Sequence, residues 1–256
     1  MKKQYVILLA IILLAFLAYT GLRSSGLHIS GFSLVKGGSI ELTGTDDETK
    51  IFLDNKEVAK KDLLDVAPGD HTIILSKDTY WPWKKDVSVS SNKTSALFPF
   101  LISKNVSGEI ITQTDPDYGK LRTRILGEKL PSRDSPLLSK SSLVEIWSDK
   151  NNIYAQWNGP ENNIPPYFCN DKGECSSLVN VLKSENEVRN IDFYKDRDDV
   201  LLIASQNGVF AIEIDKRGTT QNFQPVYKGT ALPKFAVENA DTIYVLDGPL
   251  LFLVSI

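Results

Sequence analysis

The alternation of apolar and polar residues divides the chain into an apolar beginning and a longer, strand-like remainder. Residues 5–22, YVILLAIILLAFLAYTGL, carry no charge, and as a helix they would extend over roughly 27 Å at about 1.5 Å per residue. This length is close to the hydrocarbon core of a bilayer, about 30 Å. From residue 39 onward, apolar residues alternate with polar ones in short stretches that are typical of strands. The pattern predicts a single N-terminal transmembrane helix followed by a mainly β protein.

The charges around this run predict its orientation. Lys2 and Lys3 precede it and Arg23 follows, a bias that keeps the N-terminus in the cytoplasm. We therefore expect a single-pass protein of the cell membrane, with residues 1–23 as the anchor and the bulk of the chain extracytoplasmic. A cleaved signal peptide is the alternative, but cleavage after Ala18 would place Phe16 where a small residue is preferred.

Two segments follow the apolar run before the repeats begin. Residues 24–38 are rich in Ser and Gly and indicate a short stalk. Residues 39–100 contain short alternating strands separated by turn residues at positions 54–56 and 68–70. They predict a small antiparallel β-sandwich.

Within this sandwich region, several short motifs follow one another in a fixed order. They are a D-N-K turn, then A-P-G-D-H-T-I, S-K-D-T-Y-W-P-W-K-K and a final alternating strand, over about residues 39–90. In this order they resemble the PEGA domain of bacterial envelope proteins. The namesake tetrapeptide is absent, and Thr79 stands where Gly is common. The resemblance implies a small β module of envelope proteins without catalytic residues, and the best-matching positions are Pro68, Gly69, His71, Tyr80 and Trp83.

Residues 101–141 form a connector of short alternating pieces between turns rich in Pro and Asp. We expect it to pack on both of its neighbours. It is locally basic, which indicates either dispersed surface charge or contact with an anionic polymer. The cations are Lys120, Arg122, Arg124, Lys129 and Arg133.

Residues 142–256 contain an internal repeat. Three stretches each show a strand, a polar turn, a second strand and an Asn-Gly or Asp-Gly pair that ends at Gly159, Gly208 or Gly248. Such pairs supply the positive φ values of a two-residue hairpin turn. Four strands in roughly 40 to 50 residues form the unit of a β-propeller blade, so this region resembles irregular propeller repeats. Three units are fewer than a closed ring uses, and we expect propeller-like four-stranded antiparallel blades in an incomplete or open array. Three explanations stay open: the connector contributes strands to a further blade, the repeats stack as an open array, or the chain is a shortened relative of longer proteins that combine PEGA and propeller domains.

The last of these units ends at Ile256 after its third strand. A missing fourth strand would leave an apolar edge that another strand could pair with. We therefore expect self-association through the C-terminal edge strand.

Composition excludes several classes of function. The net charge of −3 and the mixing of Lys and Arg with Asp and Glu provide no broad cationic surface for nucleic acid. The chain has two cysteines, Cys169 and Cys175, which predict a local disulfide. A zinc site needs four ligands, and the two histidines, His28 and His71, lie far from this pair, so we expect no metal site.

The sequence gives little support to an enzyme. A Ser or Cys nucleophile needs a neighbouring base, and His71 fits a structural role in the sandwich. No phosphate-binding loop, dinucleotide motif or HExxH motif is present, so we expect no catalytic residue and no cofactor. Clustered acids leave open calcium binding in the DRDD loop or a carboxylate pair for glycoside hydrolysis, although turn formation explains most of them. These acids are Asp115, Asp117, Glu145, Asp196, Asp198 and Asp199.

Two aromatic residues are the candidate ligand contacts. Trp81 and Trp83 flank Pro82 in YWPWKK, and they could either stack on a sugar or peptide or close the core of the sandwich. We expect a non-enzymatic, membrane-anchored envelope protein that presents a scaffold or adhesion surface to a protein or cell-wall glycan outside the cell. The alternative is an extracytoplasmic carbohydrate-active enzyme that uses paired carboxylates.

Overall fold

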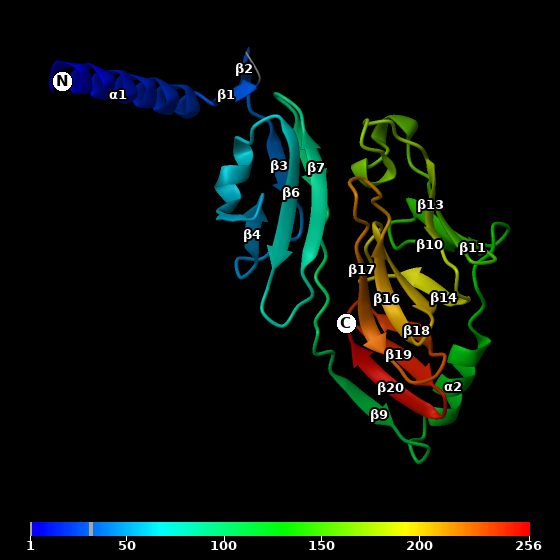
Figure 1. Cartoon of the computed structure of the whole chain (residues 1–256). Coiled ribbons are helices and arrows are strands. Elements are labelled where there is room, and N and C mark those ends of the chain that lie inside the picture. The colour runs from blue at the N-terminus through cyan, green and yellow to red at the C-terminus, as the bar shows by residue number, and fades with distance from the viewer. Residues whose placement is uncertain (1, 31–32) are drawn as a thin grey trace.

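The computed structural model describes residues 2–30 and 33–256 (Figure 1). One helix, α1 (Lys2–Ser24), extends away from a body made almost entirely of strands. A two-stranded hairpin of β1 (Leu27–Ser30) and β2 (Ser33–Lys36) follows it, in the segment expected to be a stalk. His28 at this hairpin is buried and lies 2.8 Å from a carboxylate oxygen of Asp65 in the next part of the chain.

The structure contradicts the prediction that residues 5–22 cross a membrane. Within the residues that it describes, no helix is long and apolar enough to form a span. Helix α1 lacks the apolar length that a hydrocarbon core of about 30 Å requires. The single-pass location with an extracytoplasmic bulk was derived from that span and is corrected on the same finding.

The next region forms two small sheets that share one core. The larger sheet is antiparallel with strand order β5-β4-β6-β7, and the smaller one pairs β3 with β8. That second pair is parallel, which corrects the wholly antiparallel prediction, because the chain completes the larger sheet before β8 returns beside β3. The elements are β3 (Ser39–Leu42), β4 (Lys50–Leu53), β5 (Lys56–Val58), η1 (Lys60–Leu64), β6 (Gly69–Ser76), β7 (Trp83–Val89) and β8 (Thr94–Leu97).

The remainder forms three four-stranded antiparallel sheets, as the repeats predict, and we call them the first, second and third blades. The first blade has the order β10-β11-β12-β13, the second β14-β15-β16-β17 and the third β18-β19-β20-β9. Their strands are β10 (Leu137–Leu138), β11 (Val144–Asp149), β12 (Asn152–Trp157), β13 (Leu178–Lys183), β14 (Val188–Phe193), β15 (Val200–Ser205), β16 (Gly208–Glu213), β17 (Phe223–Lys228), β18 (Lys234–Asn239), β19 (Thr242–Asp247) and β20 (Leu250–Ser255).

The second blade lies between two cores. Its strand β15 is buried along its whole length, and its side chains alternate between two clusters. Leu201 and Ile203 pack with the first blade, whereas Val200 and Leu202 pack with the third blade and the sandwich. Successive side chains of a strand point to opposite faces, so a strand covered on both faces needs an unbroken apolar run. The run VLLIA at residues 200–204 satisfies this requirement.

The hairpin turns expected at Gly208 and Gly248 are confirmed. Gly208 pairs with Ser205 across the β15–β16 turn, and Gly248 lies in the β19–β20 turn with a φ of 61°. The turn expected at Gly159 is wrong, because β12 and β13 are joined by a long segment that contains two 3-10 helices, η2 (Glu161–Asn163) and η3 (Pro166–Phe168). Prolines at the beginning of these helices lack the backbone donor that a paired strand requires.

The edge expected to be open at the C-terminal strand is occupied by an earlier part of the chain. Strand β9 (Gly108–Ile111), from the connector, pairs antiparallel with β20 and supplies the fourth strand of the third blade. Helix α2 (Tyr118–Gly127), also from the connector, buries Ile125 against Ala236, Leu246 and Leu251 of that blade. The predicted self-association required an unpaired edge at β20, and β9 occupies that edge.

A buried ion pair joins the sandwich to the second blade. Lys85 on β7 is 0% exposed, and its ammonium donates to a Glu213 carboxylate oxygen at 2.7 Å and to the Asp215 carbonyl at 2.8 Å. The Trp83 indole donates to the other Glu213 oxygen at 3.1 Å. Burial raises the pKa of Glu213, and the adjacent Lys85 charge opposes that shift. These contacts fix β7 against β16.

Removing the Lys85 charge should destabilise this junction strongly. We expect Lys85→Met to lower the free energy of unfolding by about 3–5 kcal/mol, because Glu213 would remain buried without its cation. Lys84 is adjacent and exposed, so Lys84→Met is the matched control and should change stability by less than about 0.5 kcal/mol. Urea unfolding of both variants checks this, and equal effects would contradict the assignment.

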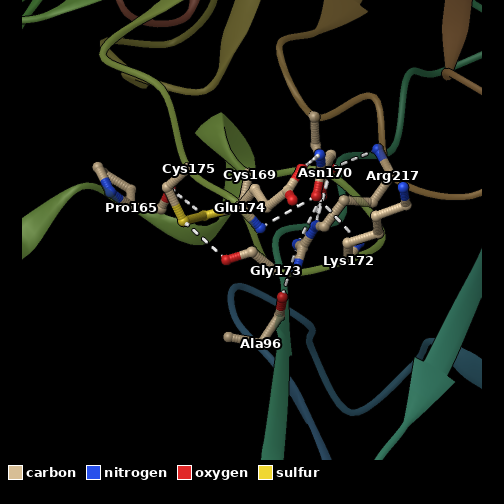
Figure 2. Close-up of a disulfide and its surroundings, with 10 residues drawn as sticks. Ala96, Pro165, Cys169, Asn170, Lys172, Gly173, Glu174, Cys175 and Arg217 are labelled. Carbon is tan, nitrogen blue, oxygen red and sulfur yellow. Dashed lines mark hydrogen bonds and ion pairs between the residues drawn. A yellow bond between two sulfur atoms is a disulfide. The ribbon is translucent and has the colours of Figure 1, made fainter.

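The predicted disulfide between Cys169 and Cys175 is present, in a turn between β12 and β13 (Figure 2). Within the bridged loop, the Asn170 side chain accepts hydrogen bonds from the backbone amides of Lys172 and Glu174. The Asp171 side chain accepts a hydrogen bond at 2.7 Å from the backbone amide of Gly218, in the β16–β17 connection.

That connection links the disulfide loop to the sandwich. The Arg217 guanidinium donates to the Ala96 carbonyl at 2.9 Å, a contact shown in Figure 2, and the Thr219 hydroxyl donates to Asp86. Gly218 has a φ of 77°, and a Cβ there would lie 2.5 Å from the Asp86 carbonyl oxygen. The close approach therefore requires glycine.

Replacing both cysteines by serine should lower the free energy of unfolding by about 2 kcal/mol, the chain-entropy contribution of a loop this short. Thermal and urea unfolding of Cys169→Ser/Cys175→Ser measure this change. Wild type treated with reductant serves as the control and should match the double variant. Unchanged stability in both would show that the bridge does not restrain the unfolded chain.

Candidate functional site

A cleft lies where the sandwich meets the second and third blades. It has a volume of about 460 Å³, within the range of small-molecule sites, about 300–1,000 Å³. The sandwich contributes Trp81, the segment before β9 contributes Lys104, and β17 and β20 contribute the other walls. We define the junction cleft by Trp81, Lys104, Tyr227, Lys228 and Phe252.

Trp81 is held in the loop between β6 and β7. Thr79 in this loop has a φ of 68°, and its carbonyl accepts a hydrogen bond at 2.7 Å from the Lys104 amide. The Trp81 amide donates to the Ile102 carbonyl at 2.8 Å. Backbone bonds on both sides of Trp81 therefore attach this loop to the segment that leads into β9, and the indole remains only partly buried.

Two lysines lie over the Trp81 ring. The ammonium of Lys104 is 5.4 Å from the ring centroid and that of Lys228 is 5.6 Å from it, both within cation–π range. The residues that line the cleft include no Asp or Glu. In the part of the chain that the structure describes, neither lysine has a carboxylate partner. The cleft is therefore locally cationic in a chain of net charge −3.

The opposite wall is aromatic and rigid. The rings of Tyr227 and Phe252 are 5.7 Å apart between centroids. The Tyr227 hydroxyl donates to Asp247 at 3.0 Å, and Asp247 also accepts from the backbone amides of Thr230 and Ala231. Burial, and then the hydrogen bond to Asp247, raise the pKa of Tyr227 to about 12. Tyr227 is thus a neutral, fixed ring at physiological pH.

The two tryptophans predicted as ligand contacts occupy different environments. Trp81 lines the junction cleft, where a ligand could reach it. Trp83 is 1% exposed, and its indole donates a hydrogen bond to Glu213. It packs in the core, so the prediction that it contacts a ligand is wrong. Pro82 separates the two and lies just before β7, where Trp83 is the first inward-facing residue.

The acids of the DRDD loop are brought together in a surface depression, but each is engaged locally. Asp196 pairs with Lys140 at 2.6 Å, Asp198 accepts from the Ser141 hydroxyl at 2.7 Å, and Asp199 pairs with Arg197 at 2.5 Å. No cluster of three or more His, Cys, Asp or Glu side chains in the described ranges is placed to hold a metal ion.

Of the other candidates, Asp115, Glu145 and His71 also have local partners. Asp115 accepts from the Asp117 amide at 3.0 Å at the beginning of α2, and Glu145 accepts from the Asn158 side chain at 3.0 Å. The two ring nitrogens of His71 lie 2.7 Å from an Asp54 oxygen and 2.7 Å from the Ala67 carbonyl. These contacts have the character of turn and loop supports.

One acid that the sequence analysis did not single out has a raised pKa. Asp192 on β14 accepts a hydrogen bond from the Phe193 amide at 2.7 Å. Burial raises its pKa to about 6, and the nearby charges of Glu128 and Asp196 add to that shift. The carboxylate therefore ionises at a cost to the folded state. The available sequence signal was an acid between Ile191 and Phe193, two apolar residues of the same strand.

This cost predicts a pH-dependent gain in stability for Asp192→Asn. The folded-state pKa of about 6 exceeds the unfolded value of about 3.9, so the wild type loses stability as pH rises through that interval. We expect the variant and wild type to be alike near pH 4, and the variant to be more stable by about 1–3 kcal/mol at pH 7. Urea unfolding at several pH values measures the difference, and a constant difference would contradict the burial of this charge.

Comparison with known proteins finds a weak structural similarity. No family model matches the chain, so the PEGA resemblance gains no support, and no curated protein matches its sequence. A solved structure described as "Structure of Dos1 propeller" is similar at 9% identity and a TM-score of 0.31, covering 78% of this chain. The chain spans 44% of the length of that structure. The chain belongs to the class of mainly β, propeller-like proteins. This assignment rests on its own four-stranded antiparallel sheets.

Proposed function

We propose that this chain is a non-catalytic binding protein and that its junction cleft binds a saccharide. The observation that carries the proposal is Trp81, a partly buried indole in a cleft whose other wall presents Tyr227 and Phe252. Aromatic rings combine a broad apolar face with low conformational entropy, and buried aromatic anchors dominate many binding sites.

The size of the cleft supports a small ligand over a large protein surface. Its volume of about 460 Å³ suits a compact ligand, whereas a typical protein interface buries about 800 Å² per partner. The side chains of Ser103 and Ser107 add hydroxyl groups to the lining. A few polar groups beside an apolar wall match the mixed surface of a sugar ring.

The rigidity of the surroundings supports binding by a preformed site. One wall belongs to the sandwich and the other to the blades, and the buried Lys85–Glu213 pair fixes these two parts. A site that is already ordered loses less entropy when its ligand binds. Hydrolysis of a glycoside normally requires two carboxyl groups beside the bond, and the cleft lining has none. This is why we propose binding and not catalysis.

Trp81→Ala should weaken binding without unfolding the protein. On an array of neutral and acidic oligosaccharides, we expect the full chain to bind and the variant to lose roughly tenfold or more in affinity. Its melting temperature should fall by no more than about 4 °C, because the indole is only partly buried. Phe223 on the same strand as Tyr227 is 41% exposed but lies outside the cleft lining, so Phe223→Ala is the control and should bind as wild type.

If Trp81→Ala is unstable, Trp81→Tyr keeps an aromatic ring in the loop and should bind with intermediate affinity. A wild-type chain that binds no saccharide on the array, or a stable Trp81→Ala variant that binds as wild type, would overturn the proposed function. Binding of peptides but not of saccharides would show that the cleft binds a protein ligand, and would also overturn the proposed function.

A further inference from the structure

We infer that the ligand of the junction cleft is an acidic saccharide, whose carboxylate binds Lys104 and Lys228 while its ring lies against the aromatic wall. The inference rests on the proposed function and specifies its substrate class. It follows from the charges of the cleft, from the carboxylate partners of the other cations, and from the apolar surface beside the two lysines.

The two lysines differ from most of the cations that the structure places at contacts, although Lys60, Arg189 and Lys216 also contact only hydroxyl or carbonyl oxygens. Seven others lie at contacts with carboxylates: Lys77, Lys85, Arg124, Lys140, Lys195, Arg197 and Arg217. Lys104 and Lys228 contact an indole ring, and no carboxylate pairs with either within the described residues. Their charges are therefore available to a ligand.

The geometry brings these two charges to one place. Both ammoniums are measured to the same Trp81 centroid, so they are no farther apart than the sum of 5.4 Å and 5.6 Å. That upper limit is close to the Debye length, about 10 Å at 0.1 M salt, so screening leaves only a weak repulsion between the two positive charges at that separation. An anion bound between them relieves that repulsion and gains attraction to both. The chain as a whole carries a net charge of −3, whereas the lining of the cleft contains lysines and no acid.

The aromatic wall decides the kind of anion. A small inorganic anion would use the two ammoniums but leave Tyr227 and Phe252 without a contact. A uronic acid joins one carboxylate to a pyranose ring, which has apolar C–H faces and several hydroxyl groups. Its carboxylate fits the lysines, its ring faces fit the aromatic side chains, and its hydroxyls fit Ser103 and Ser107.

The test uses a charged probe and its neutral counterpart. Isothermal titration of the full chain with trigalacturonic acid and with its methyl ester isolates the carboxylate, because the two share ring and linkage. We expect the acid to bind at least tenfold more tightly than the ester. Its affinity should fall severalfold when salt increases from about 50 to about 500 mM, as screening weakens both contacts.

Charge-removing variants assign the effect to the two lysines. Lys104→Gln and Lys228→Gln should each lower affinity for the acid by roughly threefold to tenfold and leave affinity for the ester unchanged. Lys183 is exposed on β13, away from the cleft lining, so Lys183→Gln is the matched control and should bind the acid as wild type does.

The outcomes separate this inference from the proposed function. Equal binding of acid and ester that depends on Trp81 but not on the lysines would overturn the acidic ligand and leave saccharide binding intact. Absence of binding to the acid would overturn the inference, and a blank saccharide array would overturn the proposed function as well. Binding of adenosine monophosphate in place of the acid would show that another ring-bearing anion is the ligand and would also overturn it.

Discussion

The buried ammonium of Lys85 is the interaction on which the arrangement of this molecule depends. A charge with no solvent exposure is stable only where its partners replace water, and both of its hydrogen-bond partners come from the second blade. Asn222 extends the same network, because its side-chain amide donates to Glu213 and to the Lys84 carbonyl. The sandwich and blade therefore have one relative position that pairs the buried Lys85 and Glu213 charges, and that position creates the junction cleft.

A second constraint is that the apolar face of the third blade, and the edge of its strand β20, must be covered. A closed propeller covers its blades by forming a ring, but three sheets cannot do so. This chain covers the third blade with β9 along its edge and α2 over its face, and the sandwich shares a core with the second and third blades. The connector between sandwich and blades thus acts as a structural cap. Terminal repeats of other stacked arrays need caps for the same reason.

Local patterns were sufficient to predict most of the blade strands, the three repeats and the disulfide, because each of these depends on residues close together in sequence. The pairing of β9 with β20 joins a segment that precedes the blades in the sequence to the last strand of the third blade. The short stretch GEII gives no local sign of this partner. The apolar run at residues 5–22 shows the opposite error: composition predicted a span that the described helix does not provide.

The candidate site was only partly predictable for the same reason. Trp81 and Trp83 look equivalent in YWPWKK, yet β7 begins at Trp83 and turns its residues 83, 85, 87 and 89 inward. A lysine at one of these inward positions was the available sign of a buried acidic partner. Lys104 and Lys228 come from distant segments, and only the docking of the sandwich on the second blade brings them to one indole ring.

Hydrogen exchange of the Trp83 indole tests this account most directly. Its Nε1–H donates to Glu213 inside the junction, so the proton exchanges with solvent only when the sandwich separates from the second blade. By nuclear magnetic resonance of protein labelled with ¹⁵N-tryptophan, the account predicts strong protection of this proton, approaching that of the central strand β15. Exchange at the rate of an exposed indole, with β15 still protected, would show that the junction opens in the folded protein and would contradict the central claim.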